Sequence, residues 1–215
     1  MLPCDKIRTM ENKRLSEIAH ELAAVAAAGK WYTKDKFDRE HYEDILRISR
    51  ELLTIGTDIT PEKAEDLLEG NDGYQTPKVD TRAVIFNERE EVLLVKDFDG
   101  RWNPPGGWCE FNLSIKENTI KEALEEAGIK AEPYRLAAVL DHRKNNNPNS
   151  MFSIVKCFVL CRNLGGEFVP NIETTEARYF PLDSLPDINT HKINRKELEL
   201  CLEAYRADSW ETVFD

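Results

Sequence analysis

The first third of the chain has the hydrophobic spacing of amphipathic helices. Apolar residues recur at three- and four-residue steps in two segments, and this spacing gathers them on one face of a helix. A third, shorter helix is predicted to begin at Thr60-Pro61, because threonine can cap a helix and proline suits its first position. The apolar positions are Leu15, Ile18, Ala19, Leu22, Val25 and Ala26 in the first segment and Tyr42, Ile45, Leu46, Leu52 and Leu53 in the second.

The pattern changes after a polar, glycine-containing break at residues 70–73. Two short β-rich runs, at residues 81–86 and 91–95, predict a hairpin because only four polar residues separate them. Further strands are expected at residues 135–140, 152–160 and 177–180, and a last helix at 192–205. We therefore expect a small all-helical domain over residues 1–74 and a mixed α/β domain with one central helix over residues 75–215.

The central helix of the α/β part is marked by signals at both ends. Ser114 and Glu117 have the spacing of a capping box, in which each side chain accepts a hydrogen bond from the other residue's backbone. Gly128 fits the position just beyond the last turn, where the left-handed conformation favours glycine. The helix is therefore predicted to run from residue 115 to about residue 127.

Composition and charge limit the classes of partner. The 215 residues are 41% hydrophobic and 32% charged, which is typical of a globular protein. The net charge of −11 argues against broad nucleic-acid binding, but a divalent cation would let an acidic protein hold phosphate groups. No run of about 20 apolar residues suggests a membrane span, and the start has no apolar signal segment, so we expect a cytoplasmic protein with no membrane partner.

Three carboxylates on the central helix are the first candidate for chemistry. Glu122, Glu125 and Glu126 stand at positions i, i+3 and i+4, so they share one face. On their own they fit an ordinary solvated acidic face. The preceding Gly106 and Gly107 change this interpretation, because glycines let backbone carbonyls approach a ligand closely. A cluster of hard oxygen donors suits Mg²⁺ or Mn²⁺.

The segment from Gly107 to Ile129, GWCEFNLSIKENTIKEALEEAGI, resembles the Nudix box, G-x5-E-x7-R-E-U-x-E-E-x-G-U, in which U is aliphatic. The resemblance implies a Nudix α/β/α sandwich over about residues 78–208. It also implies hydrolysis of a pyrophosphate bond in a nucleoside diphosphate linked to another group. Leu113 stands where the box has its first glutamate and Lys121 where it has arginine, which puts the outer geometry of the helix in question.

The helical part extends the resemblance. Residues 31–38, WYTKDKFD, look like the N-terminal region of hydrolases of X-linked nucleoside diphosphates, and residues 106–109 and 165–168 match the same group. That group includes ADP-ribose and CDP-choline pyrophosphatases. The resemblance implies that the helical part packs between subunits of a homodimer, although simple packing within one chain is an alternative.

The resemblance also suggests roles for single residues. Glu122 and Glu126 are the first choice as metal ligands, followed by Glu125 and the Gly107 carbonyl, with Glu125 and Glu126 counted as catalytic. The general base is expected in the loop before the strand at 177–180. Glu173 is the first choice there and Glu176 the second, and ordinary surface acids are the alternative.

Four residues are candidates for contacts with the substrate. Arg82 could meet a phosphate or a base, although a surface ion pair is the commoner fate of such an arginine. Trp108 could stack on a base or pack into the core. His142 and Arg143 could form a basic lip for a distal phosphate or belong to a solvated loop. His142 is not expected to bind metal, because the proposed ligands are all oxygen.

Two other functions remain open. One keeps the chemistry but acts on the 5′ end or body of an RNA, which the acidic balance argues against. The other is a Nudix-like ligand-binding module without turnover, which Leu113 and Lys121 favour and the three intact glutamates oppose. A DNA-reading role for the helical part is not expected, because residues 1–70 hold 11 Lys and Arg against 15 Asp and Glu.

Overall fold

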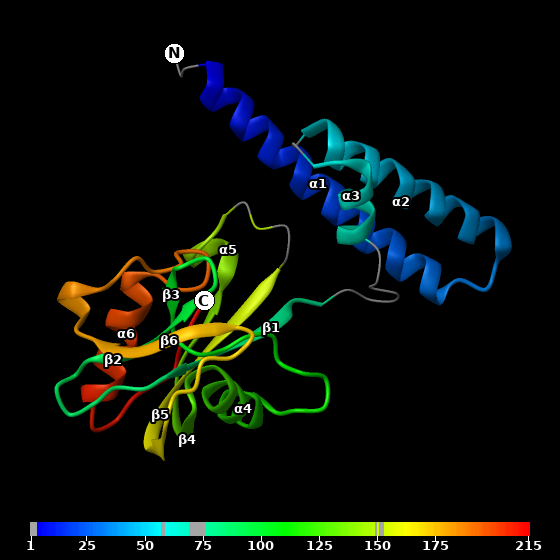
Figure 1. Ribbon diagram of the computed structural model, residues 1–215. Coiled ribbons are helices and arrows are strands. Elements are labelled where there is room, and N and C mark those ends of the chain that lie inside the picture. The colour runs from blue at the N-terminus through cyan, green and yellow to red at the C-terminus, as the bar shows by residue number, and fades with distance from the viewer. Residues whose placement is uncertain (1–3, 57–58, 69–75, 149, 151–152) are drawn as a thin grey trace. The chain divides into compact units, whose positions relative to one another are not determined.

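The computed structural model describes residues 4–56, 59–68, 76–148, 150 and 153–215 (Figure 1). The chain divides into two compact units, residues 1–76 and 77–215. In the described part of the chain, no helix is long and apolar enough to cross a membrane.

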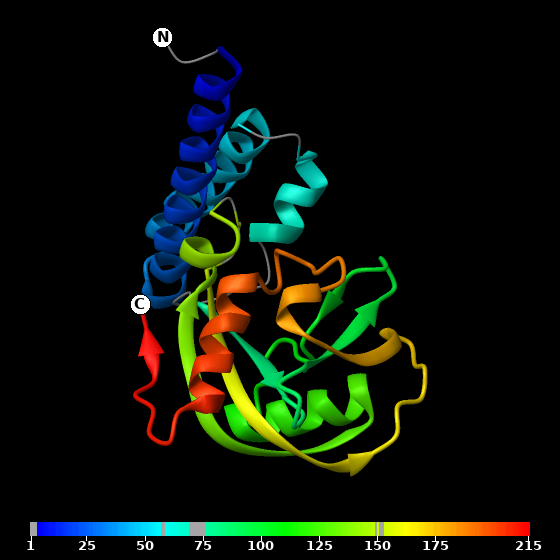
Figure 2. The same cartoon turned by 90° about the vertical axis from the view of Figure 1, so that its left-hand side faces the viewer.

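The described residues of the first unit form the three predicted helices, α1 (Cys4–Tyr32), α2 (Lys36–Gly56) and α3 (Pro61–Leu68). Figures 1 and 2 show α1 and α2 side by side. Asp35 begins α2, because its side chain accepts hydrogen bonds from the backbone N–H groups of Phe37 and Asp38, at 2.7 and 3.1 Å. Small side chains allow the helices to pack closely, and the buried residues include Ala19, Ala23, Ala26, Leu53 and Ala64.

The second unit contains two sheets. The strands of the first follow the order β1-β5-β4-β7 and those of the second the order β3-β2-β6. In the first sheet β1 and β5 are parallel whereas β4 and β5 are antiparallel, so the sheet is mixed. The strands are β1 (Lys78–Val84), β2 (Val92–Asp97), β3 (Trp102–Asn103), β4 (Ile129–Asp141), β5 (Ile154–Gly166), β6 (Thr174–Phe180) and β7 (Val213–Phe214).

Helices α4 (Ile115–Ala127) and α6 (Arg195–Arg206) cover different sides of these sheets (Figure 2). Successive side chains of a strand point to opposite faces of the sheet, so alternate strand residues pack against α4 and against α6. Ala83 and Val159 pack with α4, while Val84 and Phe158 pack with α6. The predicted α/β/α sandwich with a mixed sheet, preceded by a helical segment, is confirmed.

The end signals of α4 are also confirmed. Ser114 and Glu117 form both halves of the capping box. Gly128 has φ of 67° and donates to the Leu124 carbonyl. A Cβ at this position would lie 2.2 Å from the Glu167 carbonyl oxygen, so the helix can end here only at glycine.

The predicted hairpin is only partly correct. A single bridge joins Phe86 to Val92, but β1 and β2 belong to different sheets, and their other partners are β5 for β1 and β3 and β6 for β2. Long-range pairing therefore overrides the short turn. The strands β4 and β5 are longer than predicted, and α6 begins at Arg195 because Asn194 caps it. The short β3, β7, α5 (His142–Asn145) and the 3-10 turn η1 (Leu182–Ser184) had no clear signal in the sequence.

Candidate active site

A cavity of about 530 Å³ lies in the second unit and brings together most of the residues singled out in the sequence. Seven of them line it: Arg82, Gly107, Trp108, Glu122, Glu126, His142 and Glu173. Residues that had not been singled out also line it, among them Asp80, Glu110, Lys156, His191 and Lys192. Glu125, Arg143 and Glu176 are outside this lining.

The glycine turn before α4 is fixed against the free edge of β1. The backbone N–H groups of Thr81 and Ala83 donate to the carbonyls of Gly107 and Pro105, at 2.9 and 2.8 Å. Gly106 has φ of 149°, and a Cβ there would lie 1.9 Å from the Thr81 carbonyl oxygen. This contact requires glycine. The Gly107 carbonyl uses one of its two lone pairs on Thr81, which leaves one for a ligand.

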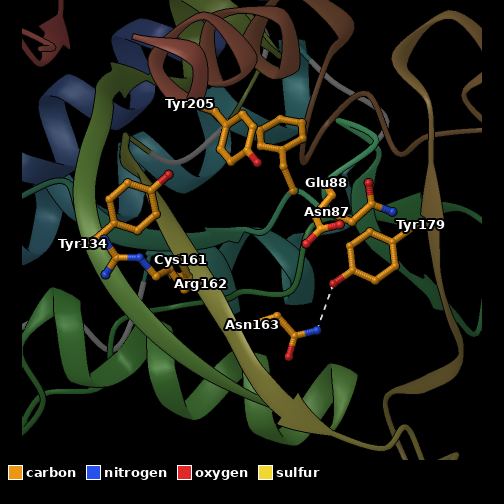
Figure 3. Close-up of a pocket in the computed structure, with 9 residues that line it drawn as sticks. Asn87, Glu88, Tyr134, Cys161, Arg162, Asn163, Tyr179 and Tyr205 are labelled. Atoms are coloured by element: carbon orange, nitrogen blue, oxygen red, sulfur yellow. Dashed lines mark hydrogen bonds between the residues drawn. The ribbon is translucent and has the colours of Figure 1, made fainter. Parts of the chain in front are cut away.

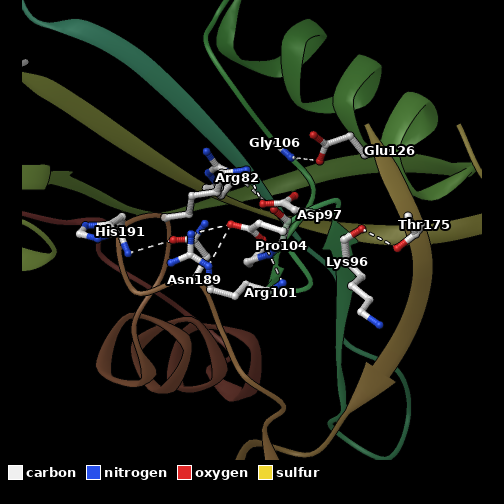
Figure 4. A network of polar contacts seen from close by, with 12 residues as sticks. Arg82, Lys96, Asp97, Arg101, Pro104, Gly106, Glu126, Thr175, Asn189 and His191 are labelled. Atoms are coloured by element: carbon white, nitrogen blue, oxygen red, sulfur yellow. Dashed lines mark hydrogen bonds and ion pairs between the residues drawn. The ribbon is translucent and has the colours of Figure 1, made fainter. Parts of the chain in front are cut away.

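Glu122 and Glu126 extend from α4 into the cavity and are both 7% exposed. Burial raises the pKa of Glu126 to about 7, although a hydrogen bond from the Gly106 N–H (2.8 Å) and the charge of Arg82 act in the other direction. Burial also raises the pKa of Glu122, and the charges of Glu125 and Glu173 add to this increase. Figure 4 shows Glu126 reaching Gly106 beside Arg82. Two desolvated carboxylates in one cavity favour the binding of a cation.

Glu125 is held differently from its two neighbours. Its side chain is 55% exposed and accepts a hydrogen bond from Lys121 Nζ at 2.6 Å. The same ammonium lies 3.3 Å from carboxylate oxygens of Glu110 and of Glu122. Glu110 therefore supplies an acidic partner for Lys121, which Leu113 cannot. The two departures from the box are compensated locally, by a point-charge cluster in place of a bidentate pair.

Arg82 is buried, and the expectation of a surface ion pair is wrong. Its Nε and Nη2 donate to the two carboxylate oxygens of Asp80, at 2.8 and 2.6 Å, and both side chains are at most 8% exposed. The two residues stand two apart on β1, so their side chains share a face. A bidentate pair of this kind fixes the guanidinium in one orientation at the cavity wall.

Of the other two expected basic residues, His142 lines the cavity and Arg143 does not. His142 begins α5 and is 5% exposed. Burial is the largest cause of the lowering of its pKa, so the ring is neutral at pH 7. Arg143 does not line the cavity; its backbone N–H donates to the capping Asp141 at 2.7 Å. Trp108 is 50% exposed at the cavity rim rather than packed in the core, whereas Trp102 is a core residue.

The loop before β6 separates the two candidate bases. Asn171 donates to the Glu125 carbonyl at 2.8 Å and accepts from the backbone of Glu173, which attaches the loop to the end of α4. Glu173 thereby lines the cavity. Glu176 instead pairs with Lys96 at 2.9 Å and with Arg178 at 2.5 Å, outside the cavity lining.

The carboxylate and carbonyl oxygens that line the cavity are the kind of ligand that a divalent cation prefers. Among the described residues, no three His, Cys, Asp or Glu side chains gather at one point as in an all-protein metal cage. Magnesium in phosphate-processing sites is usually held by one or two carboxylates together with phosphate oxygens and water. Glu122 and Glu126 meet that requirement.

A second cavity, of about 700 Å³, lies at the other end of the same strands (Figure 3). Tyr134, Tyr179 and Tyr205 line it, and Glu88 is the one carboxylate in its lining. It therefore lacks the paired carboxylates of the first cavity, which remains the candidate for phosphate chemistry.

Comparison with known families agrees with this geometry. Residues 76–201 match the model of the NUDIX domain. Residues 13–68 match a family described as a UDP-X-like, N-terminal oligomerisation domain. The chain belongs to the Nudix hydrolase family, and its predicted class, a Nudix pyrophosphohydrolase, is confirmed. Nudix hydrolases generally use divalent metal ions.

Individual relatives cover most of the chain. "Putative ADP-ribose pyrophosphatase YjhB" of Bacillus subtilis (strain 168) is 37% identical over 93% of this chain and 96% of its own. A crystal structure of an ADP-ribose pyrophosphatase from Streptococcus suis 89-1591 is 51% identical, with a TM-score of 0.61, over 65% of this chain and 100% of that one. A crystal structure of a UDP-X diphosphatase is 30% identical, with a TM-score of 0.61, over 94% and 98%. The chain thus resembles proteins of this group in both of its units.

Proposed function

We propose that the chain hydrolyses the pyrophosphate bond of a nucleoside diphosphate linked to another moiety, of the ADP-ribose or CDP-choline type, and releases a nucleoside monophosphate. One observation carries the proposal: the buried Glu122 and Glu126 share a cavity with buried basic side chains. Such a cavity offers donors for a metal ion and hydrogen-bond donors for phosphate oxygens. The names of the relatives support the choice of substrate class.

Mg²⁺ or Mn²⁺ is the proposed cofactor. Glu122 and Glu126 would hold it, with the free lone pair of the Gly107 carbonyl as a further donor. Bound metal would offset phosphate charge and activate a water molecule. Glu125 would complete the acidic face of α4 without entering the cavity. From its exposed position it would hold Lys121, which in turn contacts Glu122.

Glu173 is the proposed general base. It lines the cavity close enough to Glu122 to raise the pKa of that carboxyl group through its charge. Glu176 is engaged by Lys96 and Arg178, which leaves it poorly placed to accept a proton from water. The test is a pair of variants: Glu173→Gln should lower kcat far more than Glu176→Gln. Equal effects would contradict the assignment.

Arg82, Trp108 and His142 are proposed to contact the substrate. Arg82 and His142 present polar groups to the phosphates. Trp108 offers an exposed ring at the rim on which a base can stack. Arg143 is not proposed to contact the substrate, because it lies outside the cavity lining.

A homodimer is proposed for the helical unit. Large apolar side chains are exposed on its helices, including Val25 (66%), Tyr32 (69%) and Ile55 (76%). Exposed apolar surface of this kind is typical of an interface, and the family description of this unit points the same way. Sedimentation velocity should give the mass of a dimer; a monomer at micromolar concentration would contradict the proposal.

The substrate class is tested by a panel of ADP-ribose, CDP-choline, a UDP-linked sugar, nucleoside triphosphates and a 5′-triphosphorylated RNA, with release of monophosphate as the readout. We expect turnover of a linked diphosphate. Preference for the RNA, with binding that weakens steeply with salt, would favour an RNA-directed hydrolase. Binding of ligand and metal without any turnover would favour a non-catalytic module.

A further inference from the structure

Lys156 is a buried lysine in the middle of the first sheet. It stands opposite Asp80 on β1 and Leu140 on β4, in a run of otherwise apolar residues on β5, and it is 2% exposed. Its side chain lines the candidate active site. Removing an ammonium group from water costs several kcal/mol unless a partner compensates for it. The partners of its Nζ therefore decide whether the buried charge is fully compensated within the protein or is available to a ligand.

Among the described residues, the surroundings of Lys156 give the ammonium hydrogen-bond acceptors but no direct ion pair. Nζ donates to Asn146 Oδ1 at 3.2 Å and to the Lys192 carbonyl. In the described part of the chain no carboxylate forms an ion pair with Lys156, although the charge of the buried Glu197 on α6 is the strongest of those that raise its pKa. Asp80, the nearest acid along the strand register, is already engaged by both nitrogens of the Arg82 fork. An ammonium has three N–H groups, so one remains for a ligand.

His142 gives a second, independent indication. His142 directly follows β4 and also lines the cavity, and its Nδ1 is buried without a hydrogen bond of normal geometry among the described residues, although the side chain of Asn146 lies near the ring. Buried polar atoms are rarely left unpaired, because each costs the desolvation energy of the group. A neutral imidazole can carry its proton on Nδ1 and so donate to an acceptor in the cavity.

Lys156 lies on β5, and His142 begins α5 directly after the neighbouring strand β4. Leu140 pairs with Lys156 in the β4–β5 register, and His142 follows two residues later. Both residues line the cavity that Glu122 and Glu126 also line from α4. The cavity therefore has an acidic side, suited to a cation, and a side with unused donors, suited to an anion.

We propose that Lys156 and His142 form an anion subsite that holds a phosphate group of the substrate, opposite the carboxylates of α4. The subsite rests on the proposed hydrolase function, because it assigns one phosphate of the linked diphosphate to these two residues. Lys156 supplies a charge-assisted hydrogen bond and His142 a neutral one. Neither residue takes part in proton transfer; both position the phosphate.

The probe for the subsite is inorganic phosphate, whose binding needs no turnover. Its affinity is measured by calorimetry on the full chain, in chelator and again with Mg²⁺, for wild type, Lys156→Met and His142→Phe. Methionine keeps the apolar stem of lysine and removes the charge. Lys196→Met is the matched control, because Lys196 is an exposed lysine on α6 outside the cavity.

We expect Lys156→Met to weaken phosphate binding by roughly 10- to 100-fold and His142→Phe by roughly 3- to 10-fold, as loss of a charged and of a neutral hydrogen bond predicts. The KM for a linked diphosphate should rise in parallel while kcat falls less. The metal concentration that gives half-maximal activity should be unchanged in both variants. Lys196→Met should behave as wild type.

Phosphate affinity, measured beside thermal unfolding, separates a binding role from a structural one. A lysine buried only for packing would leave Lys156→Met less stable and phosphate binding unaltered. We expect phosphate binding to weaken even where stability also falls, because Lys156→Met removes the charge that acts on the buried Glu197 as well as the donor to phosphate. Phosphate affinity within twofold of wild type in folded Lys156→Met, or in His142→Phe if the first variant does not fold, overturns the subsite. If wild type binds phosphate through Lys156 but cleaves no linked diphosphate, the hydrolase proposal fails and the anion subsite stands.

Discussion

Replacement of Gly106 by alanine should destabilise the second unit and disturb the candidate active site together. The new Cβ would lie 1.9 Å from the Thr81 carbonyl oxygen, in a backbone conformation, φ of 149°, that side chains avoid. The Cβ position is fixed by the backbone of Gly106 and the oxygen belongs to the backbone of Thr81, so neither can move without breaking the pairing of the turn with β1. The Gly106 N–H would also lose its 2.8 Å hydrogen bond to Glu126.

The size of the effect follows from these two losses. A residue forced into such a conformation costs about 1–3 kcal/mol, and a hydrogen bond to a buried carboxylate contributes about 1.5–3 kcal/mol. The free energy of unfolding should therefore fall by about 3–5 kcal/mol. This is a large part of the 5–15 kcal/mol that is typical of a domain.

Gly100→Ala is the matched control. Gly100 also has a positive φ, 86°, but a Cβ there would meet nothing within 4 Å. Its replacement should cost only the conformational strain, about 1–2 kcal/mol. Urea unfolding followed by tryptophan fluorescence measures both variants. Equal losses of stability in the two would refute the steric reasoning about Gly106.

Three further changes test the electrostatics of the site. Because the pKa of Glu126 is raised to about 7, the native state binds more protons than the unfolded state between about pH 4.5 and 7, so metal-free stability should fall as pH rises through this window. Glu126→Gln should remove that slope and gain up to about 3 kcal/mol at pH 8; an unchanged slope in pH-dependent urea unfolding would contradict the burial argument. Lys121→Met should destabilise α4 by about 1 kcal/mol, because it leaves three carboxylates unscreened, and added salt should reduce the loss; a salt-independent loss would count against the cluster. Arg82→Met should cost about 3–5 kcal/mol by leaving Asp80 buried and unpaired, while the double variant Arg82→Met/Asp80→Leu should recover most of it in the same assay; additive losses would show that the pair is not the unit of stability.

The sequence was most informative where structure is determined locally. The limits of α4 followed from Ser114, Glu117 and Gly128, because capping and the left-handed C-terminal turn involve residues a few positions apart. The shared face of Glu122 and Glu126 followed from helical periodicity for the same reason. That both carboxylates are buried in one cavity is a tertiary property.

Contacts between distant segments could not be predicted in the same way. The environment of Arg82 depends on the turn that covers the edge of β1, and that of Lys156 depends on the parallel register between β1 and β5. A lysine within an apolar strand run was a signal for Lys156 that could have been recognised. The role of Glu110 as the partner of Lys121 was not predictable, because the residue lies outside the positions that define the motif.

The most direct measurement is release of AMP from ADP-ribose by wild type and Glu126→Gln, each with and without Mg²⁺, with the fold of the variant checked by circular dichroism. Metal-dependent release is expected in wild type. The variant should be at least about 100-fold slower, since a metal contributes several kcal/mol to stabilisation of the transition state. Equal rates in the two proteins, or wild-type turnover that persists in chelator, would contradict hydrolysis at a metal held by the carboxylates of α4.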